Sequence, residues 1–151
     1  MRRATLILAS MVVIVVVAAG VAFAVTISGG NSGTTLNGSS NADTLSGGAG
    51  SDHLSGRGGA DSLFGDSGDD VLDGGPGNDH LEGGTDDNVL RGGGGDDWIS
   101  GADHNGNDFV DDGDGANDIC VIDNFGFGSA TQRDETSSCE HVWVTQAEPG
   151  V

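Results

Sequence analysis

Residues 38–100 read GSSNADTLS, GGAGSDHLS, GRGGADSLF, GDSGDDVLD, GGPGNDHLE, GGTDDNVLR and GGGGDDWIS when the chain is divided into blocks of nine. Each block begins with glycine, has an acid or amide at its sixth position and has an aliphatic residue at its eighth. The sixth positions are Asp43, Asp52, Asp61, Asp70, Asp79, Asn88 and Asp97. The eighth positions are Leu45, Leu54, Leu63, Leu72, Leu81, Leu90 and Ile99, and Leu36 begins the series. This unbroken period indicates a repeat architecture.

The residue types within one block suggest a turn followed by a strand. Glycines at the first and fourth positions permit φ > 0 and close backbone approach. We therefore expect six residues to form a turn whose carbonyl oxygens face inward, with the sixth residue adding a carboxylate. The last three residues, such as 53–55, should form a minimal strand in which only the middle side chain points to the core.

Blocks 47–55 and 74–82 match the pattern GGxGxDxUx in full, where U is a large aliphatic residue. The pattern resembles the calcium-binding nonapeptide of the repeats-in-toxin (RTX, haemolysin-type) family. The resemblance covers about residues 38–120. It implies an all-β fold, a parallel β-roll (a two-sided β-solenoid), in which two blocks make one lap. Each block would then stack on the next block but one.

Electrostatics then predicts a dependence on calcium. Stacked aspartates would lie about 4.8 Å apart, where like charges repel by about 3.5 kcal/mol at an effective dielectric constant of about 20. Ca²⁺ reverses the sign of this contribution and accepts a mixed carboxylate and carbonyl shell, so binding of several ions and folding should be one event. The expected ligands are the side chains of Asp43, Asp52, Asp61, Asp70, Asp79, Asn88, Asp97, Asp108 and Asp118 and the backbone carbonyls of Gly47, Gly56, Gly65, Gly74, Gly83 and Gly92.

Several blocks depart from the pattern. Asn41 takes the fourth position of its block, where asparagine tolerates the left-handed conformation. Asn88 retains an amide oxygen but loses a charge, so its site should be weaker. Arg57, Asp66 and Ala102 replace the second glycine, which makes a regular turn less expected there. Residues 25–37 are expected to form an N-terminal cap that contains a degenerate block, GGNSGTTLN, in which threonine replaces the acid.

The register breaks after Ser100. A bulged nonapeptide would restore it, with Asp108 as ligand and Val110 in the core. The alternative for residues 101–114 is an EF-hand-like loop, which also binds calcium. It lacks the invariant glycine, the final glutamate and flanking helices, so we favour the bulged repeat. The loop ligands would be Asp103, Asn105, Asn107, Asp111 and Asp114. In the last block, 113–120, either Asn117 or Asp118 could be the ligand.

The two ends of the chain have their own signals. Residues 1–24 read as an export signal, with Arg2 and Arg3, an apolar run from residue 6 and an A-x-A site ending at Ala24. The alternative is an uncleaved N-terminal membrane anchor. Residues 121–151 should form a short C-terminal β cap with strands at 121–123 and 142–144. Cys120 and Cys139 are the only cysteines, and in an exported chain they should form a disulfide. Small exported RTX proteins often end in a similar tail.

Composition excludes several classes of function. The net charge is −19 and lysine is absent, which argues against nucleic-acid binding and against docking on anionic membranes. The sequence contains no HExxH, no GxSxG and no phosphate-binding glycine loop with lysine, so we do not expect an enzyme.

Three functional interpretations remain. The leading one is a secreted calcium-binding protein whose folding responds to extracellular calcium. The second is a cell-surface interaction or adhesion module in which calcium is purely structural. Its partner would bind the outward row of Val71, Val89 and Phe109 or the face that carries Trp98. The third and most remote is a fragment of a secreted RTX enzyme.

Overall fold

The computed structural model describes residues 24–102, 106–123, 139 and 141–145, together with the backbone of two short strands at 12–14 and 135–137. Within these residues the chain forms strands and turns and no helix. No described segment is a helix of the length and apolarity needed to cross a membrane. The strands are β1 (Val12–Ile14), β2 (Thr26–Ser28), β3 (Thr35–Asn37), β4 (Thr44–Ala49), β5 (His53–Ser55), β6 (Ser62–Ser67), β7 (Val71–Pro76), β8 (His80–Glu82), β9 (Val89–Gly94), β10 (Trp98–Ser100), β11 (Phe109–Asp114), β12 (Ile119–Asp123), β13 (Glu135–Ser137) and β14 (His141–Thr145).

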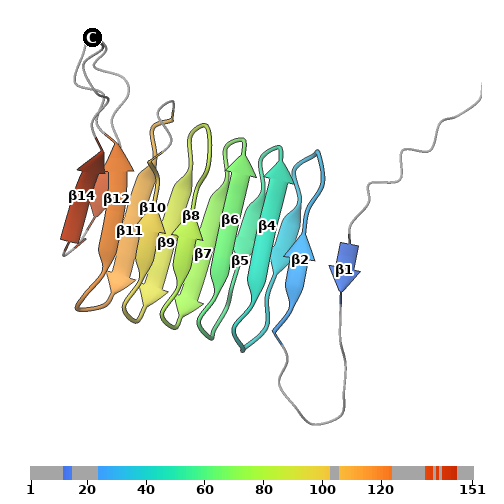
Figure 1. Cartoon of the computed structure of the whole chain (residues 1–151), viewed down its shortest axis with the longest axis horizontal. Coiled ribbons are helices and arrows are strands. Elements are labelled where there is room, and N and C mark those ends of the chain that lie inside the picture. The colour runs from blue at the N-terminus through green and yellow to red at the C-terminus, as the bar shows by residue number, and fades with distance from the viewer. Residues whose placement is uncertain are drawn as a thin grey trace, which may run out of the picture.

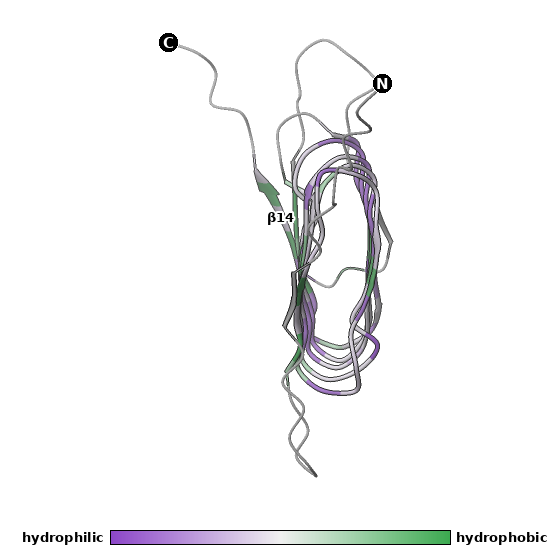
Figure 2. Ribbon diagram, turned by 90° about the vertical axis from the view of Figure 1, so that its right-hand side faces the viewer, coloured by the Kyte–Doolittle hydropathy of each residue, from purple (hydrophilic) through white to green (hydrophobic). Residues whose placement is uncertain are grey.

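Successive strands alternate between two sheets that face each other. One sheet has the order β1-β2-β4-β6-β8-β10-β12-β14, and the other has the order β13-β11-β9-β7-β5-β3. Figure 1 shows the laps side by side along the long axis, and Figure 2 looks along that axis at a flattened coil. This confirms the predicted parallel β-roll.

The strand register confirms that each block stacks on the next block but one. Leu45 pairs with Leu63 on the neighbouring strand of one sheet, and Leu54 pairs with Leu72 in the other. Neighbouring strands in each sheet are parallel, except that β1 pairs antiparallel with β2. Strand β1 lies within the predicted export signal, residues 1–24, most of which lies outside the described residues.

The core is a double column of the predicted eighth-position side chains. The leucines from Leu45 to Leu90 and Ile99 are 0 % exposed, because each projects between the two sheets and is covered by the laps on either side. Ile27 at the N-terminal end and Ile122 at the other are also buried, and the sequence pattern did not single them out. The core consists of Ile27, Leu36, Leu45, Leu54, Leu63, Leu72, Leu81, Leu90, Ile99, Val110, Cys120 and Ile122.

The first glycine of a block does not have the positive φ that the sequence analysis allowed for it. Positive φ occurs at the second and fourth positions, as at Gly48 (97°) and Gly50 (103°), whereas the first glycine is absent from this set. The second position keeps this conformation even where glycine is replaced, at Arg57 (78°) and Asp66 (75°). Asn41, expected to stand in for glycine at a left-handed fourth position, does not have positive φ.

Several strands are longer than the three residues expected. Five of them, such as β4 and β6, extend to six residues across the first residues of the next block. The extension follows from continued pairing between laps, since Gly48 pairs with Asp66 and Ala49 with Ser67. The turn that follows each of these longer strands is therefore shorter than six residues, whereas six residues connect β5 to β6 and β8 to β9.

The C-terminal segment continues the roll. The predicted strands at 121–123 and 142–144 are parts of β12 and β14, which pair in parallel with Cys120 opposite Val142. Strand β13, which the sequence did not indicate, pairs with β11 in the other sheet. The predicted disulfide between Cys120 and Cys139 is present, with the two Cα atoms 6.1 Å apart.

Candidate metal centre

The sixth-position acids form a buried row beside the core column. Each immediately precedes a strand, so its side chain points inward, as does the aliphatic residue two positions later. Their exposed fractions are no more than 3 %. The row consists of Asp43, Asp52, Asp61, Asp70, Asp79, Asn88, Asp97, Asp108 and Asp118.

One oxygen of each side chain links two laps. Asp61 Oδ1 accepts a hydrogen bond of 2.7 Å from the backbone N–H of Asp43, and Asp79 Oδ1 accepts one of 2.8 Å from Asp61. At the N-terminal end, Thr34 occupies the acid's place, and its N–H donates to Asp52 Oδ1 over 2.6 Å. Each acid therefore anchors the lap before it through one oxygen, which leaves the other oxygen for a different role.

That second oxygen lacks a hydrogen-bond partner in five of these residues. The Oδ2 atoms concerned are inaccessible to solvent and belong to Asp52, Asp61, Asp70, Asp79 and Asp97. Burying an ionised oxygen without a partner is costly, so each of these atoms calls for a proton or a cation.

Backbone carbonyls lie next to these oxygens. A Cβ added to Gly47 would lie 2.5 Å from Asp52 Oδ2 and 2.8 Å from the carbonyl oxygen of Gly65 in the next lap. The first glycine is therefore required by close approach, because a side chain would fill the space between these two oxygens. The same arrangement recurs at Gly56, Gly65, Gly74 and Gly92.

The six carbonyls named from the sequence all belong to this series. We call the space beside a first glycine, between the carboxylate oxygen and the carbonyl oxygen of the next lap, a cradle. The cradles of Asp52, Asp61, Asp70 and Asp79 contain, in this order, the carbonyls of Gly65, Gly74, Gly83 and Gly92. The carbonyl of Gly56 lies near Asp43, and that of Gly47 lies near Thr34, which has no carboxylate. Each cradle from Gly38 to Gly74 combines a carboxylate with a carbonyl oxygen, the hard donors that Ca²⁺ prefers.

The electrostatics of the row is repulsive. Burial raises the pKa of Asp70 and Asp79 to about 6 and that of Asp97 to about 7. Burial also raises the pKa of Asp61. A hydrogen bond from the acid in the preceding lap lowers each pKa, whereas the negative charge of that acid raises it. The residues present therefore favour a bound cation at neutral pH.

Asn88 differs from the acids in what it presents to its cradle. Its Oδ1 accepts from Asp70 N over 3.0 Å, as the aspartates do, while its Nδ2 donates to the carbonyl of Asp86 over 3.1 Å. The amide nitrogen lies where the aspartates have Oδ2, beside Gly83. The cradle thus loses both a charge and an oxygen, and the weaker site expected from the sequence stays a prediction.

Residues 106–114 follow the geometry of a bulged repeat. Asp108 Oδ1 accepts from Asn88 N over 2.7 Å, and Val110 pairs with Leu90 in the core. Of the other EF-hand-like candidates that the structure describes, Asp111 and Asp114 lie in β11, and Asn107 donates its backbone N–H to Asp87 Oδ1 over 2.9 Å. Asp103 and Asn105 lie outside the described residues.

The last block resolves one ambiguity. Asp118 is 0 % exposed, and its Oδ1 accepts from Asp97 N over 2.7 Å. Asn117 is exposed, and its amide donates to Asp96 Oδ1 over 3.3 Å. Asp118 therefore takes the place of the inward acid.

Sequence reasoning missed one buried acid, Asp112, which is 0 % exposed. Its carboxylate lies with the sulfurs of Cys120 and Cys139 in a group whose atoms are all within 4.8 Å of one another. The two sulfurs are bonded to each other, so they do not offer the thiolates that zinc prefers. The sequence contains no clear signal for this acid, because only the strand register, with Gly113 opposite Gly93, shows that Asp112 takes the place of a first glycine.

Comparison with known proteins agrees with this geometry. The profile of the RTX calcium-binding nonapeptide repeat, which spans four copies, matches residues 37–72 and 73–103. No curated protein and no solved structure matches the chain at a significant level. Residues 37–103 therefore consist of repeats of the RTX calcium-binding nonapeptide type.

Proposed function

We propose that this chain is an exported calcium-binding protein whose roll folds when Ca²⁺ enters the cradles between laps. The observation that carries the proposal is the series of buried Oδ2 atoms without hydrogen-bond partners, at Asp52, Asp61, Asp70, Asp79 and Asp97. Each lies beside a carbonyl oxygen of the next lap. Calcium supplies the positive charge that removes the repulsion between laps, so binding energy becomes folding energy.

An extracellular location would suit calcium sites that are weak. Extracellular modules bind calcium in the range of about 10⁻⁴–10⁻³ M, so a chain with such sites would remain unfolded inside a cell and fold outside it. The N-terminal basic and apolar sequence and the disulfide fit an oxidising, extracellular destination. Rolls of this repeat typically have a structural role rather than a catalytic one, and we propose no enzymatic activity.

Circular dichroism during calcium titration tests the proposal. The EDTA-treated protein at neutral pH should show an unfolded spectrum, and Ca²⁺ should produce a cooperative rise in β signal. Mg²⁺ should fail, because it is smaller and demands near-ideal octahedral geometry. A compact roll in EDTA that is unchanged by calcium would overturn the proposal.

The competing function is recognition of a surface partner by the outward rows. Strand register places His53, Val71, Val89 and Phe109 in one row, and Phe109 is 37 % exposed. On the other sheet His80 stacks on Trp98, with ring centroids 4.2 Å apart. Alanine at Val71, Val89 and Phe109 separates the two functions. Loss of adhesion to cells with an unchanged calcium titration would favour recognition.

A further inference from the structure

Three segments that are separate in the sequence meet at the C-terminal end of the roll. Strand β11 carries Asp112, β12 carries Cys120, and Cys139 follows β13. The pairing of β11 with β13 sets Asp111 opposite Ser137, so the residues just beyond them lie close together. Cys120 belongs to the core and projects toward them from the opposite sheet. The strand register therefore brings a carboxylate and two sulfurs to one place.

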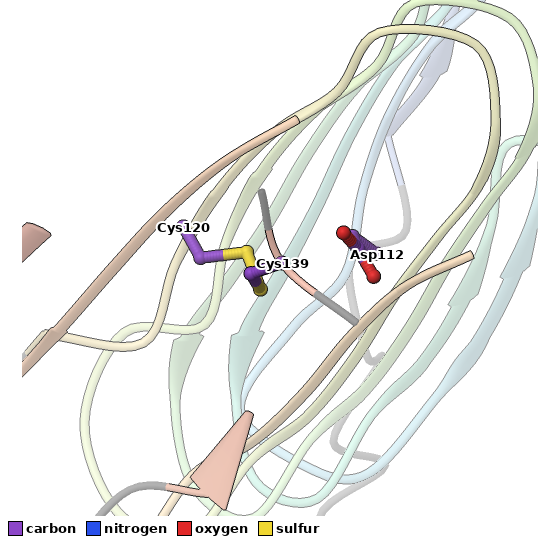
Figure 3. Close-up of side chains that lie close together, drawn as sticks. All are labelled: Asp112, Cys120 and Cys139. Atoms are coloured by element: carbon purple, nitrogen blue, oxygen red, sulfur yellow. A yellow bond between two sulfur atoms is a disulfide. The ribbon is translucent and has the colours of Figure 1, made fainter. Parts of the chain in front are cut away.

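The ligand atoms of these three residues converge. A carboxylate oxygen of Asp112 and the Sγ atoms of Cys120 and Cys139 all lie within 4.8 Å of one another. Figure 3 shows the carboxylate beside the two sulfurs. Asp112 and Cys120 are buried, whereas Cys139 is only partly buried, so the group lies at the edge of the core rather than deep within it.

The disulfide decides whether these atoms can bind a metal ion. The metal ligand is the thiolate, and a sulfur bonded to another sulfur is not one. A dithiol reductant supplies two electrons and two protons: the S–S bond breaks, two thiols form, and the reductant becomes a disulfide. Metal binding then displaces both thiol protons into solvent.

Zinc suits the ligand set that reduction would create. Zn²⁺ binds thiolates and carboxylate oxygens in tetrahedral geometry, and with Zn–S bonds of about 2.3 Å its two sulfurs lie about 3.8 Å apart. That separation is smaller than the 4.8 Å within which the three ligand atoms already lie, so they can reach one ion without a large movement of the backbone. Calcium prefers oxygen ligands, so this group differs in kind from the cradles.

We propose that Asp112, Cys120 and Cys139 form a zinc site that the disulfide closes and that reduction opens. Two thiolates and one carboxylate hold the ion, and a water molecule completes its tetrahedral shell. The ion joins β11, β12 and the segment after β13, so it replaces the cross-link that reduction removes. The inference does not depend on calcium binding, because it uses none of the cradle oxygens.

The test is a titration of the full-length protein with Co²⁺, a spectroscopic substitute for Zn²⁺, in saturating calcium. One sample is first reduced with a dithiol, which is then removed without exposure to air, and the other sample keeps its disulfide. Thiolate-to-cobalt charge-transfer bands should appear in the reduced sample, with one ion per chain, and not in the oxidised sample. Zn²⁺ should displace the cobalt and abolish the bands, because thiolate ligands favour zinc.

Two variants separate the carboxylate from the thiolates. Asp112→Asn preserves side-chain size and should weaken cobalt binding by the reduced protein at least about tenfold, since even the outer partners of a metal ligand are worth that much. Asp114→Asn removes the same charge from an exposed position of β11 and should leave the affinity unchanged. Circular dichroism in calcium establishes that both variants keep the roll.

Either of two results would overturn the inference. One is a reduced protein without cobalt–thiolate bands, and the other is an Asp112→Asn variant that binds cobalt as tightly as the wild type. Neither result would affect the proposed function, because the calcium titration followed by circular dichroism tests that separately.

Discussion

At the scale of single residues, each inward acid divides its two oxygens between two tasks. Asp79 Oδ1 accepts from Asp61 N over 2.8 Å, while Asp79 Oδ2 is buried without a hydrogen-bond partner. The first oxygen stacks the laps, and the second is available to an ion. A carboxamide can perform the first task without the second, as Asn88 does in its own block.

Asp79→Asn should therefore weaken calcium binding while it preserves the inter-lap hydrogen bond. We expect the midpoint of the calcium titration to rise several-fold, because the cradle loses a charge and an oxygen donor. Asp69→Asn is the matched control, since Asp69 is an exposed acid in the neighbouring turn. Circular dichroism against calcium concentration provides the measurement. Equal midpoints for the two variants would contradict the assignment of Asp79 as a ligand.

Arg57 illustrates a residue in a strained conformation. Its φ of 78° lies in the left-handed region, where a side chain costs about 1–2 kcal/mol. Arg57→Gly should raise the free energy of unfolding in saturating calcium by about 1 kcal/mol, because relief of strain exceeds the added freedom of the unfolded chain.

Urea unfolding of the calcium-loaded protein measures this change. Arg91→Gly provides the control, since it removes the same charge from an exposed position within β9, where glycine weakens a strand. The two substitutions should thus have opposite signs. A loss of stability in Arg57→Gly would show that the side chain contributes more than its backbone conformation costs.

At the scale of strands and turns, the sequence predicts the regular part of the roll well. The nine-residue period places Leu45 to Ile99 in the core, and it places the acids two residues earlier in the buried row. It does so because a strand alternates its side chains, so a fixed spacing fixes the face. A glycine in a block, however, can be required for either of two reasons, a left-handed backbone conformation or the close approach of another atom. Gly48 has a left-handed backbone, whereas Gly47 is required by close approach, and the sequence pattern alone does not distinguish the two.

The sequence pattern no longer predicts the structure where the nine-residue period is interrupted. The insertion after Ser100 lengthens the step between stacked core residues, so that Leu90 pairs with Val110 and Ile99 with Cys120. Once the register is lost, the sequence alone cannot say that Asp112 occupies a glycine position. Strand β13 is polar, and it forms through its pairing with β11 rather than through an apolar pattern of its own.

The disulfide connects the last strands to the core. Cys120 is fully buried beneath the final lap, and Cys139 follows β13. Reduction should lower the free energy of unfolding in saturating calcium by about 3 kcal/mol on the loop-entropy model. Thermal unfolding with and without a reductant measures the effect. The double variant Cys120→Ser, Cys139→Ser should unfold at the same temperature as the reduced protein, and the reductant should not change that temperature. An unchanged midpoint on reduction would mean that β13 and β14 add little to stability.

At the scale of the whole molecule, the buried acids link stability to pH. In the folded chain the pKa values of Asp70 and Asp79 are about 6 and that of Asp97 is about 7, each raised from 3.8. The folded state thus holds these protons more tightly than the unfolded chain. The resulting stabilisation is fully present below about pH 4 and is lost as the pH rises through 6 to 7.

In EDTA, acidification from about pH 7.5 to about pH 5 should therefore increase the β signal in circular dichroism. Protons replace calcium as the neutralising charge. With calcium present the trend reverses, because calcium binding requires ionised carboxylates and its midpoint should rise as the pH falls. The triple variant Asp70→Asn, Asp79→Asn, Asp97→Asn should flatten both responses. A calcium midpoint independent of pH would argue against these acids as ligands.

The constant step between stacked strands also bears on how such a chain can lengthen. Asp43 and Asp61, like Asp61 and Asp79, are joined across 18 residues. A tandem duplication of 18 codons within this region would therefore insert a complete extra coil, with its own leucines and cradles, and every later side chain would keep its place. A duplication half as long would transfer everything downstream to the opposite sheet, exchanging the outward surfaces while preserving the interior.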